Sequence, residues 1–416
     1  MVLIKKEERK YMKSNIGKLK INRLVRTPFI LESFAFAVIP FEEVLTLPIG
    51  SVLRFINLLV ILFSLFETSK IKIQTRKKPV LPMLIFLFYV AISYLWCYNR
   101  TFYFDRLSTY GMYGILILLL CSLKPTKDEK IIMLNGLTLG GIIASLMIIF
   151  SGAATNIGGR DTLIIFGRMI DPNILAYSCV ISLSICIYRL LVEKNNLTIN
   201  MISSVLLIMG IVICGSRGAL IASLITMVLC TLNIQAKRYK IFKRFFIFIC
   251  MTLIILFVYF EFILKSDFST RFSFANLIGQ GNMGTANRDK IWSAAFKQIA
   301  KRPIFGYGNG SSMYAIEAVY RYYGTHNSYI FVLLEFGIVG FVLVVVWQLR
   351  EFLGCCMNKC KIYKILFLTT LIFVMFIEGF STKVFWGMHV LLMTSCYGEN
   401  LIKTTEYIRQ GEFNEN

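Results

Sequence analysis

Residues 327–349 read NSYIFVLLEFGIVGFVLVVVWQL, an apolar run in which Glu335 is the one charged side chain. A helix needs roughly 20 apolar residues to cross the hydrocarbon core of a bilayer. The chain repeats this pattern along its length: 56% of its 416 residues are hydrophobic, and the mean hydropathy is +0.67. A soluble domain has too little polar surface to cover so many apolar side chains. The sequence therefore predicts an all-α polytopic membrane protein.

Apolar runs of this kind predict about 12 transmembrane helices. They lie at residues 29–47, 50–66, 80–98, 106–123, 131–150, 172–191, 199–214, 218–234, 245–264, 327–349, 363–380 and 384–398. We expect a basic cytoplasmic tail at 1–28, one polytopic transmembrane domain over 29–400, and a second cytoplasmic tail at 401–416. No internal repeat divides this domain into similar halves.

The loops between the runs alternate in charge. Lys and Arg are frequent in the N-terminal tail and in residues 70–78, 124–130, 189–194, 237–244 and 350–364. Cytoplasmic loops carry the excess of Lys and Arg, so both termini are predicted to be cytoplasmic. Most of the net charge of +22 lies in these loops, where anionic lipid headgroups account for it. We therefore expect contact with membrane lipids and no nucleic-acid partner.

Residues 265–325 form the large external loop between the ninth and tenth predicted spans. Asn287 can cap a helix that runs from Arg288 to Lys301, and Pro303 ends it. Its predicted apolar face consists of Ile291, Ala295, Phe296 and Ile299.

The rest of this loop is predicted to turn at its glycines, Gly306, Gly308 and Gly310. Ser311 or Ser312 can then cap a second short helix that runs to about Tyr323. Basic residues outnumber acidic ones in the loop as a whole. This surplus is either a solvated face with scattered charges or a surface for an anionic ligand.

Arg217 is a candidate site residue at the outer junction of the seventh and eighth predicted spans. A charge within a span costs about 2.5–3.5 kcal/mol at the helix centre, so it normally has a partner or a task. The small neighbours Gly215, Ser216 and Gly218 would let a ligand approach the guanidinium. The alternative is an arginine that extends to the membrane interface.

Histidine occurs twice in the chain, at His326 and His389. His326 follows the external loop in a polar setting, between Thr325 and Asn327. An imidazole, with an ordinary pKa of about 6.5, can accept a hydroxyl proton at neutral pH. The alternative role for His326 is a capping or hydrogen-bonding residue, and His389 is predicted to be a core histidine of the last span.

Three further arginines, Arg160, Arg168 and Arg288, are predicted on the same side of the membrane as Arg217 and His326. Arginine binds phosphate oxygens bidentately. The set would therefore suit a phosphate or pyrophosphate at the outer surface. The external loops contain neither a paired set of metal ligands nor a P-loop, so we expect no metal and no cofactor.

These residues follow the order and approximate spacing of a known motif set. It comprises Gly215-Ser-Arg-Gly-Ala219, Arg288 with Ile291-Trp292, Arg302-Pro-Ile-Phe-Gly-Tyr-Gly308, His326-Asn327, and Leu334-Glu-Phe-Gly337 with Gly340. The set resembles that of the O-antigen ligase and polymerase family of bacterial membrane glycosyltransferases. The resemblance covers roughly residues 160–345.

The resemblance implies transfer of a glycan from an undecaprenyl-pyrophosphate carrier to an acceptor hydroxyl without a metal. The reaction would occur on the external face of the bacterial cytoplasmic (inner or plasma) membrane. His326 would be the base that activates the acceptor, and Arg217 and Arg288 would bind the departing pyrophosphate. Implied substrate contacts are Arg160, Arg168 and Asn327. Implied protein partners are a flippase and chain-length regulators.

Two activities within the family fit this pattern. A polymerase adds repeat units of O-antigen, capsule or exopolysaccharide, whereas a ligase transfers the finished glycan to lipid A core, protein or wall. Composition rich in Lys, Ile, Asn and Phe suggests a low-GC genome and favours the polymerase. A transporter or flippase is the alternative from another class, since Glu32, Glu42, Glu43 and Glu378 lie in predicted spans.

Overall fold

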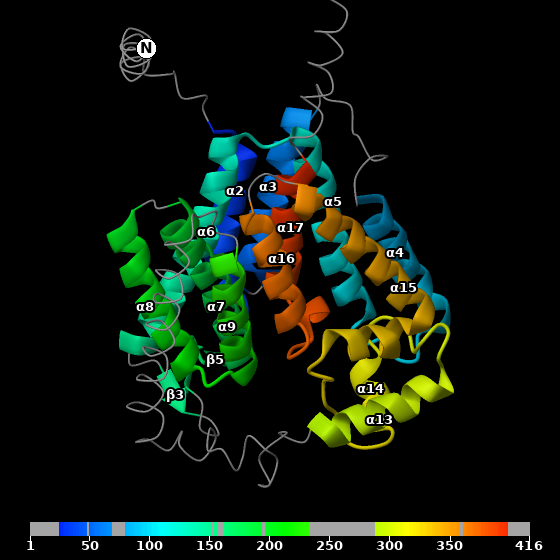
Figure 1. The fold of residues 1–416 in the computed structure, drawn as a ribbon. Coiled ribbons are helices and arrows are strands. Elements are labelled where there is room, and N and C mark those ends of the chain that lie inside the picture. The colour runs from blue at the N-terminus through cyan, green and yellow to red at the C-terminus, as the bar shows by residue number, and fades with distance from the viewer. Residues whose placement is uncertain are drawn as a thin grey trace, which may run out of the picture.

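The computed structural model describes residues 25–47, 50–68, 80–150, 154–156, 161–193, 196–232, 288–357 and 361–397. Its helices form a bundle with two short helices across one end (Figure 1). The first part of the chain supplies α2 (Thr27–Val38), α3 (Val52–Thr68), α4 (Val80–Ile92), α5 (Tyr103–Leu123) and α6 (Lys127–Phe150). The middle part supplies α7 (Pro172–Tyr188), α8 (Leu197–Ile213) and α9 (Arg217–Leu232).

The C-terminal part contains both the two helices across the end of the bundle and three helices within it. They are α13 (Arg288–Lys301), α14 (Ser312–Glu317), α15 (Ser328–Met357), α16 (Ile362–Phe373) and α17 (Lys383–Tyr397). Single turns extend or connect some of these helices: η1 (Ile39–Phe41), η2 (Ser93–Trp96), the π-helical η3 (Arg189–Glu193) and η5 (Gly379–Ser381).

Every predicted span that falls within the described residues contains a helix. Among the described residues, four helices are long and apolar enough to cross a membrane: Tyr103–Leu123, Lys127–Phe150, Pro172–Glu193 and Ser328–Met357. Several others are apolar but shorter. The ninth predicted span, residues 245–264, lies outside the described residues. The polytopic helical fold is therefore confirmed, and the total of about 12 spans stays a prediction.

The prediction of a purely helical chain misses two small antiparallel sheets. β1 (Thr46–Leu47) pairs with β2 (Gly50–Ser51), and β3 (Ala154–Asn156) pairs with β4 (Asp161–Ile165), which pairs with β5 (Arg168–Met169). The β4–β5 turn consists of Phe166 and Gly167, both with positive φ. Two positive φ values give a turn whose twist matches that of the strands, which explains this hairpin.

The core of the bundle is centred on α7, of which every residue from Asn173 to Tyr188 is buried. Small residues let the neighbouring helices approach closely. A Cβ added at Gly141 of α6 would lie 2.2 Å from Ser182 Oγ of α7, and Ser182 Oγ donates to Leu137 O at 2.7 Å. Small residues at such contacts are the usual packing device between helices in a membrane.

His389 is confirmed as a core histidine. It is fully buried in α17, and its Nδ1 lies 2.7 Å from Glu351 Oε2 of α15. The ring also lies 4.7 Å from the ring of Trp347, measured between centroids. Its contacts are all inside the bundle, so His326 is the histidine to consider for an external site.

The helix predicted over Arg288–Lys301 is confirmed as α13, but the prediction of its apolar face is partly wrong. The buried residues are Ile291, Ala294, Ala295 and Gln298. Phe296 is 52% exposed because it lies on the opposite side of the helix from these residues. The buried face packs against α14 and the start of α15.

The prediction that the second helix reaches Tyr323 is wrong, because α14 ends at Glu317. Ser311 also does not cap α14 with its side chain. Its Oγ instead donates to Asn99 O at 3.2 Å and accepts from Asn99 N at 3.1 Å. The hydroxyl therefore joins the loop to the segment after η2.

Candidate functional site

A short segment between α16 and η5 is the centre of the candidate site. We call residues 374–379 the connector, and residues 324–328, which carry His326, the His326 loop. Ser328 N donates to Val374 O at 2.9 Å, Asn327 Nδ2 donates to Met375 O at 3.1 Å, and Ser328 Oγ donates to Ile377 O at 2.9 Å. The His326 loop is thus attached to the connector mainly through backbone carbonyls.

Glu378 completes this attachment from the connector side. Its Oε1 accepts hydrogen bonds from both the backbone N and, at 2.9 Å, the Oγ1 of Thr325. Gly324 leaves the room for this contact, since a Cβ there would lie 2.8 Å from Glu378 Oε1. The carboxylate therefore fixes the residue immediately before His326.

His326 has a φ of 49°, in the left-handed region that non-glycine residues seldom adopt. Its half-buried side chain is flanked by two anchored neighbours, Thr325 and Asn327. The Oδ1 of Asn327 accepts from Tyr329 N at 2.9 Å and Ile330 N at 3.0 Å, so Asn327 caps α15. The structure therefore gives the predicted substrate contact Asn327 a clear structural role.

Arg288 reaches the same connector from the start of α13. Its Nη2 donates to Phe376 O at 3.2 Å. One turn further along α13, Trp292 Nε1 donates to Thr325 O at 2.8 Å. The beginning of α13 is thus joined to both the connector and the residue before His326.

Arg217 comes to the connector from a third direction, as the half-buried first residue of α9. The next residue, Gly218, packs on the ring of Phe376, where an added Cβ would lie 2.6 Å from Cγ. Ser216 Oγ donates to Asn173 Oδ1 of α7 at 3.1 Å. The small residues around Arg217 therefore serve close packing against the connector and α7.

Of the other two predicted arginines, Arg168 is not brought into these contacts. Arg168 is exposed on β5, three residues before the Asp171 that caps α7 by accepting from Asn173 N at 2.7 Å. Its guanidinium takes no part in the hydrogen bonds at the connector within the described residues. Arg160 lies outside the described residues.

Carboxylates near the start of α7 and α17 extend the polar end of the bundle. Glu42 Oε2 forms an ion pair with Lys383 Nζ at 2.7 Å, and Glu43 Oε2 accepts from Asp171 N at 2.7 Å. Glu42 and Glu43 follow η1 in a turn, beyond the end of the first apolar helix at Phe41. Burial raises the pKa of the Glu43 carboxyl to about 7.

Sequence reasoning missed the connector because residues 363–380 were predicted as one continuous span. The structure ends α16 at Phe373 and breaks the helix before η5. Polar residues mark this break in the sequence: Glu378, Ser381 and Lys383 follow one another at short spacing. Lys383, which pairs with Glu42, was likewise not predicted to have a partner.

A second attachment point fixes the glycine-containing part of the external loop. Glu335, fully buried in α15, pairs with Arg106 Nη1 of α5 at 2.6 Å. Its carboxylate also accepts from Gly310 N at 3.1 Å and Ser312 N at 3.0 Å. Neighbouring opposite charge and backbone donors are what a buried carboxylate requires.

Glycines with positive φ values bring this loop against the break in α15 at Gly337. Gly306, Gly308 and Gly310 have φ values of 68°, 86° and 83°, and Gly337 within α15 has a φ of 61°. A Cβ on Gly337 would lie 2.2 Å from Ile304 O. These residues of the predicted motif set therefore build the loop's backbone contacts.

Comparison with known families adds an independent finding. Residues 202–345 match the family model described as O-antigen ligase, a range that includes Arg217, Arg288 and His326. The matched range is about a third of the chain and contains the His326 loop and Glu335 but not the connector. No curated protein sequence gives a significant match.

The candidate membrane-spanning helices and this match point to a bacterial membrane protein with a region similar to the O-antigen ligase family. The resemblance seen in the sequence is thereby confirmed over residues 202–345, where the chain matches the O-antigen ligase model.

Proposed function

We propose that this protein is a surface-polysaccharide polymerase. It transfers a glycan repeat unit from an undecaprenyl-pyrophosphate carrier to a sugar hydroxyl of the acceptor, on the external face of the bacterial cytoplasmic membrane. Three side chains perform the reaction: His326, Arg217 and Arg288. The donor, the acceptor and the membrane face follow from the family resemblance.

The observation that carries this proposal is the connector. It contacts the backbone of Thr325 and the side chain of Asn327 on the two sides of His326, the guanidinium of Arg288 and the glycine next to Arg217. His326, Arg288 and Arg217 are far apart in the sequence and come from three different elements. An imidazole and two arginines on elements joined to one segment suit a reaction in which one substrate loses a proton and the other releases a pyrophosphate.

The proposed step is a direct displacement at the anomeric carbon. The acceptor hydroxyl gives its proton to the His326 imidazole while its oxygen forms the new glycosidic bond. The bond between C1 and the pyrophosphate oxygen breaks, and its electron pair leaves with the lipid pyrophosphate. Arg217 and Arg288 offset the developing negative charge, so that no metal is needed for this step. The proton leaves the imidazolium for solvent.

This displacement inverts the configuration at the anomeric carbon. NMR of the linkage in a product made from a donor of defined anomer tests that expectation. Inversion supports direct attack, and retention of configuration contradicts it.

A ligase is the second candidate because the matched family model is described as O-antigen ligase. Both activities use the same leaving group and differ in the acceptor. The amino-acid composition favours the polymerase over the ligase. The expected partners, a flippase and chain-length regulators, are partners of a polymerase.

The test is the banding of surface polysaccharide in a deletion strain complemented with wild type, His326→Ala, Arg217→Ala or Arg288→Ala. Arg321→Ala is the matched control, because Arg321 is an exposed arginine of the same loop whose guanidinium lies over the Tyr320 ring. Membrane levels of each variant are measured in parallel.

A polymerase predicts single repeat units in the three site variants and a normal ladder in the control. Long chains that accumulate on the lipid carrier would assign the protein to the ligases. Normal ladders in all variants would show that these residues are not the active site, and would favour a transporter.

A further inference from the structure

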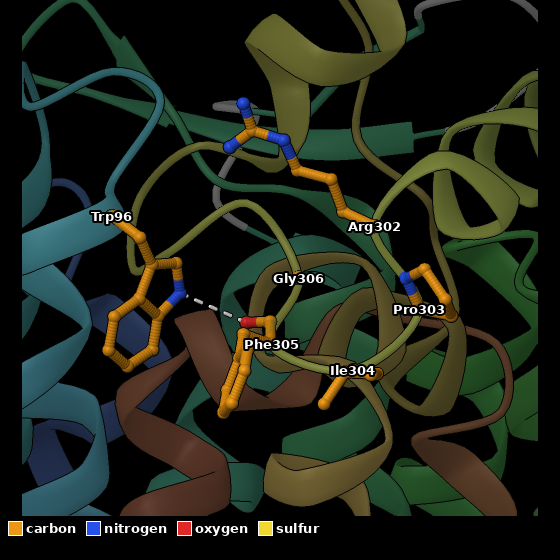
Figure 2. A pocket seen from close by; sticks show the side chains of 6 residues that line it. All are labelled: Trp96, Arg302, Pro303, Ile304, Phe305 and Gly306. Carbon is orange, nitrogen blue, oxygen red and sulfur yellow. Dashed lines mark hydrogen bonds between the residues drawn. The ribbon is translucent and has the colours of Figure 1, made fainter.

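A second candidate site lies at the other end of α13, on the side of α4 and α15. An open pocket of about 370 Å³ is lined by Trp96, Arg302, Pro303, Ile304, Phe305 and Gly306. Figure 2 shows the rings of Trp96 and Phe305 side by side, with the Arg302 guanidinium extending from the same loop away from them. The pocket thus has an aromatic part and a cationic part.

The walls of the pocket are apolar because its polar groups are already bonded. Trp96 Nε1 donates to Phe305 O at 3.0 Å, the bond drawn in Figure 2. The neighbouring Tyr89 hydroxyl donates to Phe336 O at 2.9 Å. A sugar would find few hydrogen-bonding partners on these walls, whereas a hydrocarbon chain has no hydrogen bonds to lose.

The pocket is held in shape by the backbone of α15. Ile338 N donates to Pro303 O at 2.8 Å, and Val339 N donates to Ile304 O at 3.2 Å. Gly306 permits this approach, since a Cβ there would lie 2.5 Å from the Glu335 carbonyl. The loop is therefore held in this conformation before a ligand binds.

The aromatic part continues into an exposed apolar stripe along α4 and η2. The stripe consists of residues three or four apart on one helix face: Leu81, Ile85, Phe88, Ile92 and Leu95. Phe88 is 67% and Leu95 is 77% exposed. In a membrane protein such a stripe faces hydrocarbon, so the pocket lies at the head of a path for a lipid chain.

The cationic part has no anionic partner within the described residues. The Arg302 guanidinium lies 4.8 Å from the Tyr307 ring centroid and 5.8 Å from that of Tyr98, and it forms no ion pair in these parts of the chain. Lys301 next to it is also exposed. Trp and Tyr side chains around a cation are typical of the membrane interface, where the lipid headgroups lie. The lipid-facing stripe next to them agrees with this position.

This pocket is separate from the candidate active site. Arg288 begins α13 and Arg302 follows its end, and a helix of 14 residues is about 20 Å long. Figure 1 shows α13 lying across the end of the bundle between the two places. A pyrophosphate bound by Arg288 is therefore not the group at Arg302.

We propose that the Arg302 pocket is a binding site for an anionic phospholipid. The headgroup phosphate contacts Arg302, and the upper part of one acyl chain lies against Trp96 and Phe305 and continues along α4. Such a lipid would secure the far end of α13 at the membrane surface. The proposal holds whichever glycan reaction the protein performs.

The test uses the purified full chain in nanodiscs that contain lipids brominated on the upper acyl chain. Bromine quenches tryptophan fluorescence at contact distance, and the signal of Trp96 is the difference between wild type and Trp96→Phe. Brominated phosphatidylglycerol and brominated phosphatidylcholine are titrated separately into unlabelled phosphatidylcholine. The variants are Arg302→Gln, Arg302→Lys and, as matched control, Arg321→Gln.

We expect Trp96 to be quenched at about fivefold lower mole fraction of phosphatidylglycerol than of phosphatidylcholine, which corresponds to about 1 kcal/mol for one basic residue near the surface. Arg302→Gln removes this preference, while Arg302→Lys and Arg321→Gln keep it. Equal quenching by the two lipids in the wild type, or a preference that survives Arg302→Gln, would overturn the proposal. So would recovery of Trp96 fluorescence on adding equimolar polyprenyl phosphate, which would assign the pocket to the carrier lipid.

Discussion

Two loops are attached to the bundle through carboxylates, and the two attachments differ. Glu335 is fully buried, pairs with Arg106 and accepts from two backbone N–H groups of the glycine loop. Glu378 is slightly exposed and holds the His326 loop through Thr325 alone. In the first attachment, the charges of Glu335 and Arg106 neutralise each other inside the protein, so this pair stabilises the fold. The second holds the backbone next to a half-buried imidazole, beside two arginine-bearing elements, and we propose that its role is to position this imidazole.

The largest effect on stability is expected from Glu335→Gln. The change leaves Arg106 buried without a counter-charge, which costs about 3–5 kcal/mol when one partner of a buried pair is removed. Thermal unfolding in detergent and the amount of protein in membranes should both fall. An unchanged unfolding temperature would contradict a structural role for this pair.

Gly218→Ala tests the packing of α9 on the connector. The new methyl group would lie 2.6 Å from the Phe376 ring and must displace it. Displacement of about 1 Å at a site can cost about 10²-fold in rate, so glycan transfer should fall by about 10- to 100-fold. Gly111→Ala is the control, because nothing lies within 4 Å of a Cβ there. Equal rates in the two variants would show that the connector does not position Arg217.

Glu378 is expected to act through hydrogen bonds, so its amide variant should differ from its alanine variant. Glu378→Gln keeps an oxygen that can accept from Thr325, and transfer should stay within about threefold of wild type. Glu378→Ala leaves the buried Thr325 N–H without a partner and should reduce transfer about tenfold. Imidazole added to Glu378→Ala should not restore activity, since His326 is still present. Identical losses in both variants would refute positioning by this carboxylate.

The smallest expected effect is a pH dependence of stability from Glu43. Its pKa of about 7 in the folded protein is above the ordinary carboxyl value, so the folded state binds this proton more tightly than the unfolded state. The stabilisation is complete below the ordinary pKa and is lost as the pH rises through about 7. Relative to Glu43→Gln, wild type should therefore unfold a few degrees lower at pH 8 than at pH 6. Parallel pH curves for the two proteins would contradict the shift.

Local signals in the sequence predicted part of this arrangement well. α13 begins at Arg288 and ends at Lys301 as expected from its apolar spacing and Pro303, and the glycine turn follows it. The connector was not predicted because Val374, Phe376 and Ile377 read as membrane span, although Glu378, Ser381 and Lys383 mark the end of the apolar run. The side chain of Ser311 does not cap α14, because it bonds Asn99 from a distant segment.

The candidate site was predicted as a set of residues but not as a structure. The sequence grouped Arg217, Arg288 and His326 through resemblance, and the structure adds Phe376 and Glu378 as the residues that bring them together. Gly306 and Gly337 were part of the same motif set, yet their positive φ values and close contacts assign them to the backbone of the loop. A motif alone does not separate these two roles.

The central claim is that His326 is the base of a glycosyl transfer reaction. The most direct measurement is the transfer rate of the purified protein with a polyprenyl-pyrophosphate-linked repeat unit, compared between wild type and His326→Ala. The account predicts a loss of about 10²- to 10⁴-fold with an unchanged unfolding temperature. A variant that transfers glycan at the wild-type rate would contradict it.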